Sequence, residues 1–360
     1  MPEHFNFDSV KALPGLTAAA FQHPDDRKAT AALQRVPLFA PVVRAIRGSI
    51  FEKAEALKAI SSNIRLGPNQ GKSIYSKFVK AAQMLNVARL PDLYLSSDHT
   101  INAYATGMLN YRVVVNPPLV DMLTEAELLA VLGHELGHIK CHHMVNKFLA
   151  TILYSAGAAH LAGMVPGLGS LAITALRWPL FYWYRMAELS CDRAALLVTQ
   201  DAEAVASALA KLAGWSHKVM PEINLEAILE QAREYNGTDE KTLESVLKAL
   251  MFMQGETDST HPLPIIRVQA ILKWAESDQY KDILDGNYPR EDVPVLGPAG
   301  QRFCESCGQS VSATDEFCGS CGSAQLSQNV VANACPKCGR QATAKEKFCR
   351  KCGGSMETTQ

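Results

Sequence analysis

The pattern of apolar and polar residues predicts a chain that is mostly helical. In several segments, apolar residues recur at three- and four-residue spacing, which is typical of helices with one buried face. The clearest of these segments are 51–61, 73–85, 201–213, 225–235 and 241–253. Two short runs rich in β-branched or aromatic residues, Leu93–Leu95 and Arg112–Asn116, predict strands. We therefore expect a mostly helical α+β fold with a small sheet.

The most informative polar pattern is VLGHELGHIK, residues 131–140. His134 and His138 are four positions apart, so on a helix both imidazoles lie on one face and can reach one metal ion. Glu135 then lies beside that ion, where its carboxylate can accept a proton from an activated water. The alternative is a chance pair of surface histidines that flank a glutamate.

The residues before this motif indicate a helix independently. Thr124 followed by Glu127 predicts a capping box at its start. Apolar residues at helical spacing then predict a buried face; they are Leu128, Leu129, Val131, Leu132 and Leu136.

A second helix, Tyr184–Leu197, carries the candidate third metal ligand. A catalytic zinc site takes two histidines and a glutamate, and Glu188 is the best placed carboxylate downstream of the motif. Asp192, one turn later, can accept the second N–H of a ligand histidine and fix its tautomer. Arg185 can pair with either carboxylate. The alternative is a solvated face on which all three are surface residues.

Between the two helices lies an apolar segment, Phe148–Tyr184. Phe148–Val165 has no charge over 18 residues, which just reaches membrane-spanning length. Arg177 and Pro179 then interrupt the apolar pattern before an aromatic cluster. This segment predicts a helical hairpin, which either contacts a membrane or packs against the protein.

The segment between the two predicted strands, Ser96–Gly107, is a candidate rim for an extended peptide. A strand beside an HExxH helix can offer backbone hydrogen bonds to a substrate, as in strand addition. Asn102 and Ala103 lie near the centre of this segment. The alternative is a β-hairpin with no role in substrate binding.

The cysteines predict zinc sites rather than disulfides. Eight of the ten follow residue 300 as four CxxC pairs, in two units displaced by 31 residues: Cys304, Cys307, Cys318 and Cys321, then Cys335, Cys338, Cys349 and Cys352. Each unit has the spacing of a closed Cys₄ zinc ribbon, whose folding energy comes from the metal. The second unit is basic at Lys345, Lys347, Arg350 and Lys351, so nucleic acid or an acidic protein is a candidate partner.

The net charge and the N-terminal residues bear on the partners and the cellular location of the protein. The net charge of −1 gives no global attraction to nucleic acid or lipid. The N-terminal sequence MPEHFNFDSV has no basic region followed by an apolar run, so it predicts no secretory signal. We expect a cytoplasmic location, with membrane contact through the apolar segment as an alternative.

Three motifs together, HELGH, ELSCD and STHP, resemble zinc metallopeptidases of the HtpX and CAAX-prenyl-protease type over about residues 20–272. The resemblance implies a zincin-like fold in which His134, His138 and Glu188 hold zinc. It implies that Glu135 is the general base and that Asp192 is the helix aspartate. This chain departs from the membrane-bound members because it lacks their N-terminal spanning helices and adds two zinc ribbons.

The resemblance also places the turn at His261 and Pro262 near the active site, where His261 can assist an oxyanion. We therefore predict a zinc endopeptidase with one catalytic and two structural zinc ions, whose ribbons recruit a substrate or a protein partner. The alternatives are a non-catalytic zinc scaffold and a nucleic-acid-binding module. The predicted units are an N-terminal helical region packed on the peptidase at 1–90, the peptidase at 91–274 with a hairpin at 148–184, a linker at 275–301, and ribbons at 302–324 and 333–354.

Overall fold

The computed structural model describes residues 7–36, 39, 42–43, 50–108, 110–155, 170–214, 216, 218–237, 264–291, 302–303 and 310–311. Their elements are η1 Phe7–Ser9, α1 Ala18–Phe21, α2 Pro24–Gln34, α4 Ile50–Ser62, β1 Ile64–Leu66, α5 Lys72–Met84, β2 Asp92–Leu95, β3 Ala103–Thr106, β4 Arg112–Val115, α6 Pro117–Met122, α7 Glu125–Lys140, α8 Met144–Ser155, α10 Ser170–Thr199, α11 Ala202–Ala213, η2 Met220–Glu222, α12 Leu225–Gly237, α14 Pro264–Ala275, α15 Asp278–Leu284, β5 Arg302–Phe303 and β6 Ser310–Val311. The expected fold class, mostly helical with a small sheet, is confirmed.

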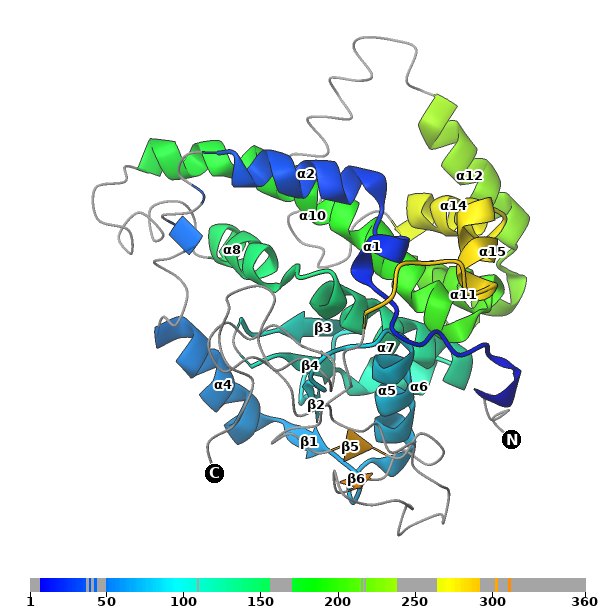
Figure 1. Ribbon diagram of the computed structural model, residues 1–360, viewed down its shortest axis with the longest axis horizontal. Helices are drawn as coiled ribbons and strands as arrows, with labels where there is room; N and C mark the ends of the chain where they lie inside the picture. The colour runs from blue at the N-terminus through cyan, green and yellow to red at the C-terminus, as the bar shows by residue number, and fades with distance from the viewer. Residues whose placement is uncertain are drawn as a thin grey trace, which may run out of the picture.

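Helix α7, which carries the HExxH motif, lies between α10 and the sheet (Figure 1). It begins with the predicted capping box: Thr124 accepts from the Glu127 backbone N–H, and the Glu127 carboxylate accepts from the Thr124 backbone N–H. These two bonds satisfy donors that the first helical turn cannot use internally. The apolar positions predicted for this helix are all buried.

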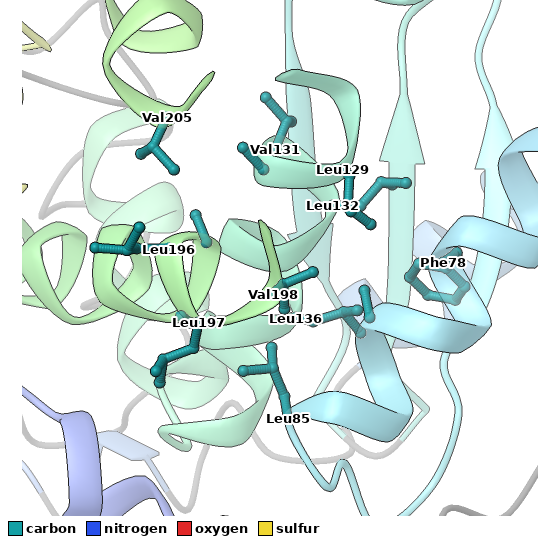
Figure 2. Close-up of a cluster of buried hydrophobic side chains, with 14 of the residues drawn as sticks. Phe78, Leu85, Leu129, Val131, Leu132, Leu136, Leu196, Leu197, Val198 and Val205 are labelled. Atoms are coloured by element: carbon teal, nitrogen blue, oxygen red, sulfur yellow. The ribbon is translucent and has the colours of Figure 1, made fainter. Parts of the chain in front are cut away.

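Three helices contribute much of the core that supports α7. Figure 2 shows side chains of α5, α7 and α10 together in it, among them Phe78, Leu85, Leu129, Leu136 and Val198. Burying one such side chain fully is worth about 1.5–3 kcal/mol. The core therefore fixes the orientation of α7 and α10, and with it the polar groups that the two helices carry.

Two glycines of the motif allow α10 to approach α7 closely. A Cβ atom added at Gly137 would lie 2.8 Å from the Ala194 Cβ and 3.1 Å from the Cys191 Cα. A Cβ atom at Gly133 would lie 3.1 Å from the Val198 Cβ. Glycine at both positions therefore lets the carboxylates of α10 reach the histidines of α7.

The sheet has the strand order β1-β2-β4-β3 (Figure 1). Strand β2 is antiparallel to β1 and parallel to β4, while β3 is antiparallel to β4. The two predicted strands are confirmed as β2 and β4. Strand β1 lies in the region predicted as helical, since three residues are too few to display a period of two.

The apolar segment forms parts of α8 and α10. Helix α10 begins at Ser170 and runs through Pro179 to Thr199, so the predicted helix Tyr184–Leu197 is the second half of a longer one. The loop of the predicted hairpin lies outside the described residues. Over the described part of the chain, no helix has both the length and the apolar character needed to cross a membrane.

The first part of the predicted linker packs against the peptidase core. Residues 275–301 include α15, whose Tyr280 and Ile283 are buried in the main core. Glu291 follows and forms an ion pair with Lys140 at the end of α7. A seven-residue helix with two buried positions is too short for its periodicity to stand out among charged residues.

Candidate active site

Three predicted residues converge between α7 and α10. The Nε2 atom of His134 lies 3.3 Å from Oε2 of Glu188, and the Nε2 atom of His138 lies 3.2 Å from Oε1 of the same carboxylate. All three residues are buried, with 6%, 0% and 1% of their surface exposed. The helical spacing of the two histidines and the close packing of α10 together produce this convergence.

The donors fit a zinc ion by their chemistry. Two imidazole nitrogens and one carboxylate form the ligand set of many catalytic zinc sites, which keep a fourth position for water or substrate. Burying two imidazole nitrogens and a carboxylate together costs free energy, and a shared cation offsets that cost. His134, His138 and Glu188 are therefore the residues best suited to hold the metal.

Cys191 offers a second geometric possibility for the third ligand. His134, His138 and Cys191 place ligand atoms within 4.8 Å of one another. The Cys191 sulfur, however, lies 3.7 Å from Nδ1 of His143, whereas Glu188 faces the Nε2 atoms of both motif histidines. Burial also raises the pKa of the Cys191 thiol well above its usual value, which disfavours the thiolate form. We therefore favour Glu188.

Asp192 lies behind His134. The His134 Nδ1 atom is 3.0 Å from Oδ1 of Asp192, as predicted for a carboxylate that fixes a histidine tautomer. Arg267 of α14 donates to both Asp192 oxygens, at 2.8 and 2.5 Å, and lies 2.9 Å from Oε2 of Glu188. No local sequence pattern indicates this role of Arg267, because it lies 75 residues from Asp192 on a mainly apolar helix. Arg185, the predicted cation, is buried, and Arg267 supplies ion pairs to both carboxylates.

The two histidines have opposite pKa shifts. Burial acts to lower the pKa of His134, but the Glu188 charge and the Asp192 hydrogen bond outweigh it and raise the pKa to about 9. Burial, and then the positive charge of Lys147, hold the pKa of His138 well below its usual value. A metal at this site therefore competes with a proton at His134 more than at His138.

Glu135, the predicted base, is held at the edge of the sheet. Its Oε2 atom accepts a 2.6 Å hydrogen bond from the backbone N–H of Ala105 in β3 and lies 3.5 Å from the Lys147 ammonium group. The residue is 1% exposed. Strand β3 and helix α8 thus fix the carboxylate next to the histidines.

A small cavity of about 30 Å³ adjoins these groups. Glu135 and His134 line it together with Asn102 and Ala103, the two residues predicted at the substrate rim. The rest of the lining is mainly aliphatic, from α6, α7, α10 and α11: Leu119, Ala130, Val131, Ala195, Val205, Ala208, Leu209 and Leu212. The surface beside the base is therefore mainly apolar.

The two histidines after the motif, His142 and His143, point in different directions. Helix α7 ends at Lys140, and His142 adopts a left-handed φ of 59°, which turns it to solvent. The His143 N–H donates to the His138 carbonyl, as in a Schellman turn, so His143 folds back under the motif. Its Nδ1 lies 3.2 Å from Nδ1 of His138, and its Nε2 lies 2.9 Å from Oδ2 of Asp26. Helical spacing alone would place His142 on the face of His138, but the helix stops between them and His142 is exposed.

Several predicted residues lie outside the described residues. They are His261 and the ribbon cysteines Cys304, Cys307, Cys318, Cys321, Cys335, Cys338, Cys349 and Cys352. Strands β5 and β6 form an antiparallel pair on either side of the first CxxC.

Comparisons with known proteins cover both parts of the chain. Residues 68–275 match peptidase family M48, and residues 304–353 match a double zinc ribbon. The plastoglobule-localized metallopeptidase 48 of Arabidopsis thaliana, described as chloroplastic, is 38% identical over 271 residues, which are 75% of this chain and 76% of the relative. A protease HtpX homolog of Thermoplasma volcanium is 28% identical over 231 residues, 58% of this chain and 73% of the relative.

Proposed function

The chain belongs to peptidase family M48 and is a zinc metallopeptidase with a double zinc ribbon, and we propose that it is an endopeptidase of protein substrates. We assign His134, His138 and Glu188 as the ligands of the catalytic zinc. The observation that carries this assignment is the pair of 3.2–3.3 Å contacts between the Glu188 oxygens and the two Nε2 atoms. Asp192 positions His134 through its Nδ1 atom.

In this proposal Glu135 performs the proton transfers. When bound, zinc supplies Lewis-acid chemistry: it polarises the scissile carbonyl and lowers the pKa of water to about 7. Glu135 accepts the proton of the attacking water and delivers it to the nitrogen of the leaving amine. The hydrogen bond from Ala105 orients its carboxylate for both steps.

The substrate would bind along β3. The Asn116 N–H donates to the Asn102 carbonyl, so the backbone groups of Asn102 point toward β4 and those of Ala103 and Ala105 point away from it. A peptide running along that side adds to the sheet edge next to Glu135. We also propose that His261 assists the developing oxyanion.

The remaining assignments concern the ribbons and the surroundings. Each ribbon would hold one structural zinc through its four cysteines, giving three zinc ions per chain with the catalytic one. The ribbons would recruit a protein substrate or partner, and the basic second ribbon is the part that would contact nucleic acid. We expect a cytoplasmic location, and the apolar segment Phe148–Tyr184 would contact a membrane if the chain does so.

The substitution Glu135→Gln tests the proposed catalysis. It keeps the shape of the side chain but removes the base, so hydrolysis of an unfolded protein should fall at least about 10³-fold. Zinc content should stay at the wild-type value, since Glu135 is not an assigned ligand. Elemental analysis and a casein cleavage assay measure the two quantities.

Glu188→Ala is the control for the ligand assignment, and it should lose one zinc ion per chain. Full zinc retention in Glu188→Ala would favour the set that includes Cys191. Wild-type protein that holds its zinc yet cleaves no unfolded substrate would instead support the non-catalytic scaffold.

A further inference from the structure

We propose that Asp26, in the N-terminal helix α2, is a positioning residue of the metal site. It holds His143 so that His143, in turn, fixes the ring and the tautomer of His138. The inference rests on the proposed function in one respect, because it takes His138 as a zinc ligand. Asp26 lies outside residues 68–275, the part of the chain that matches the peptidase family.

The contacts form a continuous chain from α2 to the metal site. Oδ2 of Asp26 lies 2.9 Å from Nε2 of His143, and Nδ1 of His143 lies 3.2 Å from Nδ1 of His138. The Nε2 atom of His138 then faces Glu188. Asp26, His143 and His138 are 0%, 1% and 0% exposed, so water does not compete for these bonds.

The Asp26–His143–His138 hydrogen bonds allow one arrangement of protons in which Nε2 of His138 can bind a metal. Burial acts to raise the pKa of Asp26, but hydrogen bonds from His143 and others outweigh it and keep the carboxylate ionised. An ionised carboxylate only accepts, so the Nε2 atom of His143 carries the proton. With this proton on Nε2, the Nδ1 atom of His143 can accept the Nδ1–H of His138, which lies 3.2 Å away. The lone pair of His138 is left on Nε2, the atom that faces Glu188 and His134.

The thiol of Cys191 supports the same arrangement. Its sulfur lies 3.7 Å from Nδ1 of His143, within reach of a weak S–H hydrogen bond. The carboxylate of Asp26 is itself held by three further donors, so its direction is fixed: Ser190 at 2.6 Å, Gln22 at 2.9 Å and Thr30 at 3.3 Å. Ser190 lies two positions after Glu188 on α10, which ties α2 to the helix of the third ligand.

The position of helix α2 brings the Asp26 carboxylate to His143. The helix runs alongside α10 (Figure 1). Pro24 begins the helix, the His23 side chain caps it, and the His23 backbone N–H donates to Ser190. Its first turn carries two adjacent carboxylates with different surroundings. Asp26 points inward, whereas the Asp25 side chain is 43% exposed and pairs with Lys28 on the same helix.

The experiment compares Asp26→Ala, Asp26→Asn and Asp25→Ala in the full-length chain. Removing an outer hydrogen-bond partner of a ligand histidine typically weakens metal affinity 10- to 100-fold. Asp26→Ala should therefore weaken Zn²⁺ binding at the catalytic site by about that factor. Asp26→Asn keeps an acceptor for His143 and should restore most of the affinity, while Asp25→Ala should leave it unchanged. Chelator competition measures the affinity, and His138→Ala identifies which zinc belongs to this site.

Substitutions of His143 separate positioning from folding. His143→Asn keeps an acceptor oxygen near the place of Nδ1, whereas His143→Leu removes it, so the Leu variant should bind zinc at least about tenfold more weakly than the Asn variant. Adding Asp26→Ala to His143→Leu should cause no further loss, because the path through His143 is already broken.

Three outcomes would overturn the inference: a folded Asp26→Ala with wild-type zinc affinity, equal affinities of His143→Leu and His143→Asn, or an undiminished effect of Asp26→Ala in the His143→Leu background. If Asp26→Ala does not fold, the pair of His143 variants decides. Failure of the proposed function has a different signature, since His138→Ala would then hold as much zinc as the wild type.

Discussion

The two histidines of α7 are held by two different parts of the chain. His134 bonds directly to a carboxylate, Asp192, on the neighbouring helix α10. The Nδ1 atom of His138 contacts His143, which bonds to Asp26 of α2. The first support lies within the part that matches the peptidase family, and the second reaches outside it. The metal site is therefore larger than the segment that carries its motif.

The two supports also differ in charge. The charge of Asp192 is neutralised by Arg267, so removing either residue leaves the other as a buried charge without that partner. Within the described part of the chain, the side chains that bond to Asp26 are His143 and three uncharged donors. An ion pair fixes the first carboxylate, and a set of hydrogen bonds fixes the second. Removing Arg267 should therefore lower the free energy of unfolding more than removing a donor to Asp26.

The largest effect is expected for Arg267→Met. The substitution keeps most of the side-chain volume but removes the guanidinium group that pairs with two buried carboxylates, Asp192 and Glu188. Breaking a buried pair in this way costs about 3–5 kcal/mol. The free energy of unfolding, measured by urea titration in excess chelator, should fall by that amount.

The control on the other side of the site is Ser190→Ala, which removes one uncharged donor to Asp26. It should cost about 1–3 kcal/mol. Equal losses for Arg267→Met and Ser190→Ala would contradict the difference in charge between the two supports.

A smaller effect, on metal affinity rather than on stability, is expected for Asp192→Asn. The amide can still accept from His134, but it removes the negative charge that strengthens the imidazole as a ligand. Zinc affinity should fall about 10-fold or more, measured by chelator competition. Asp26→Asn, which acts through one more ring, should lower the affinity less. The reverse order would mean that the indirect support of His138 is the stronger one.

The sequence predicted the parts of the site that depend on local spacing. His134, Glu135 and His138 follow from one helical turn, and the convergence with Glu188 follows from a second helix that packs closely at glycines. These residues need only the period of a helix and the ligand preference of zinc.

The parts that the sequence did not predict depend on where a helix ends or on distant contacts. Helix α7 ends at Lys140 without glycine at the left-handed position, so His142 appeared to continue the metal face. Asp26 and His143 are 117 residues apart, and no local pattern connects them. Helix α10 also starts 14 residues before the predicted helix at Tyr184 and continues through Pro179, next to the fully buried Leu180 and Trp183.

The far end of α7 offers a third carboxylate, Glu127, which supports the helix but no metal ligand. It accepts from Lys211 and Ser207 and completes the capping box with Thr124. Glu127→Gln should lower the free energy of unfolding by about 1–2 kcal/mol and leave zinc affinity unchanged, because the histidines keep their own partners. Reduced zinc affinity in a folded Glu127→Gln protein would mean that the whole helix, and not its C-terminal supports, positions the histidines.

The pH dependence of this last effect has a definite sign. Burial acts to raise the pKa of Glu127, but the bonds from Lys211, Ser207 and the Thr124 N–H outweigh it and lower the pKa below 4.5. The stabilisation is therefore fully present above pH 4.5 and is lost as the pH falls through the lowered value. Urea unfolding in chelator should show a constant difference between wild type and Glu127→Gln above pH 4.5 that shrinks below it. Asp25→Asn, which breaks an exposed ion pair, should differ from wild type by less than about 1 kcal/mol throughout.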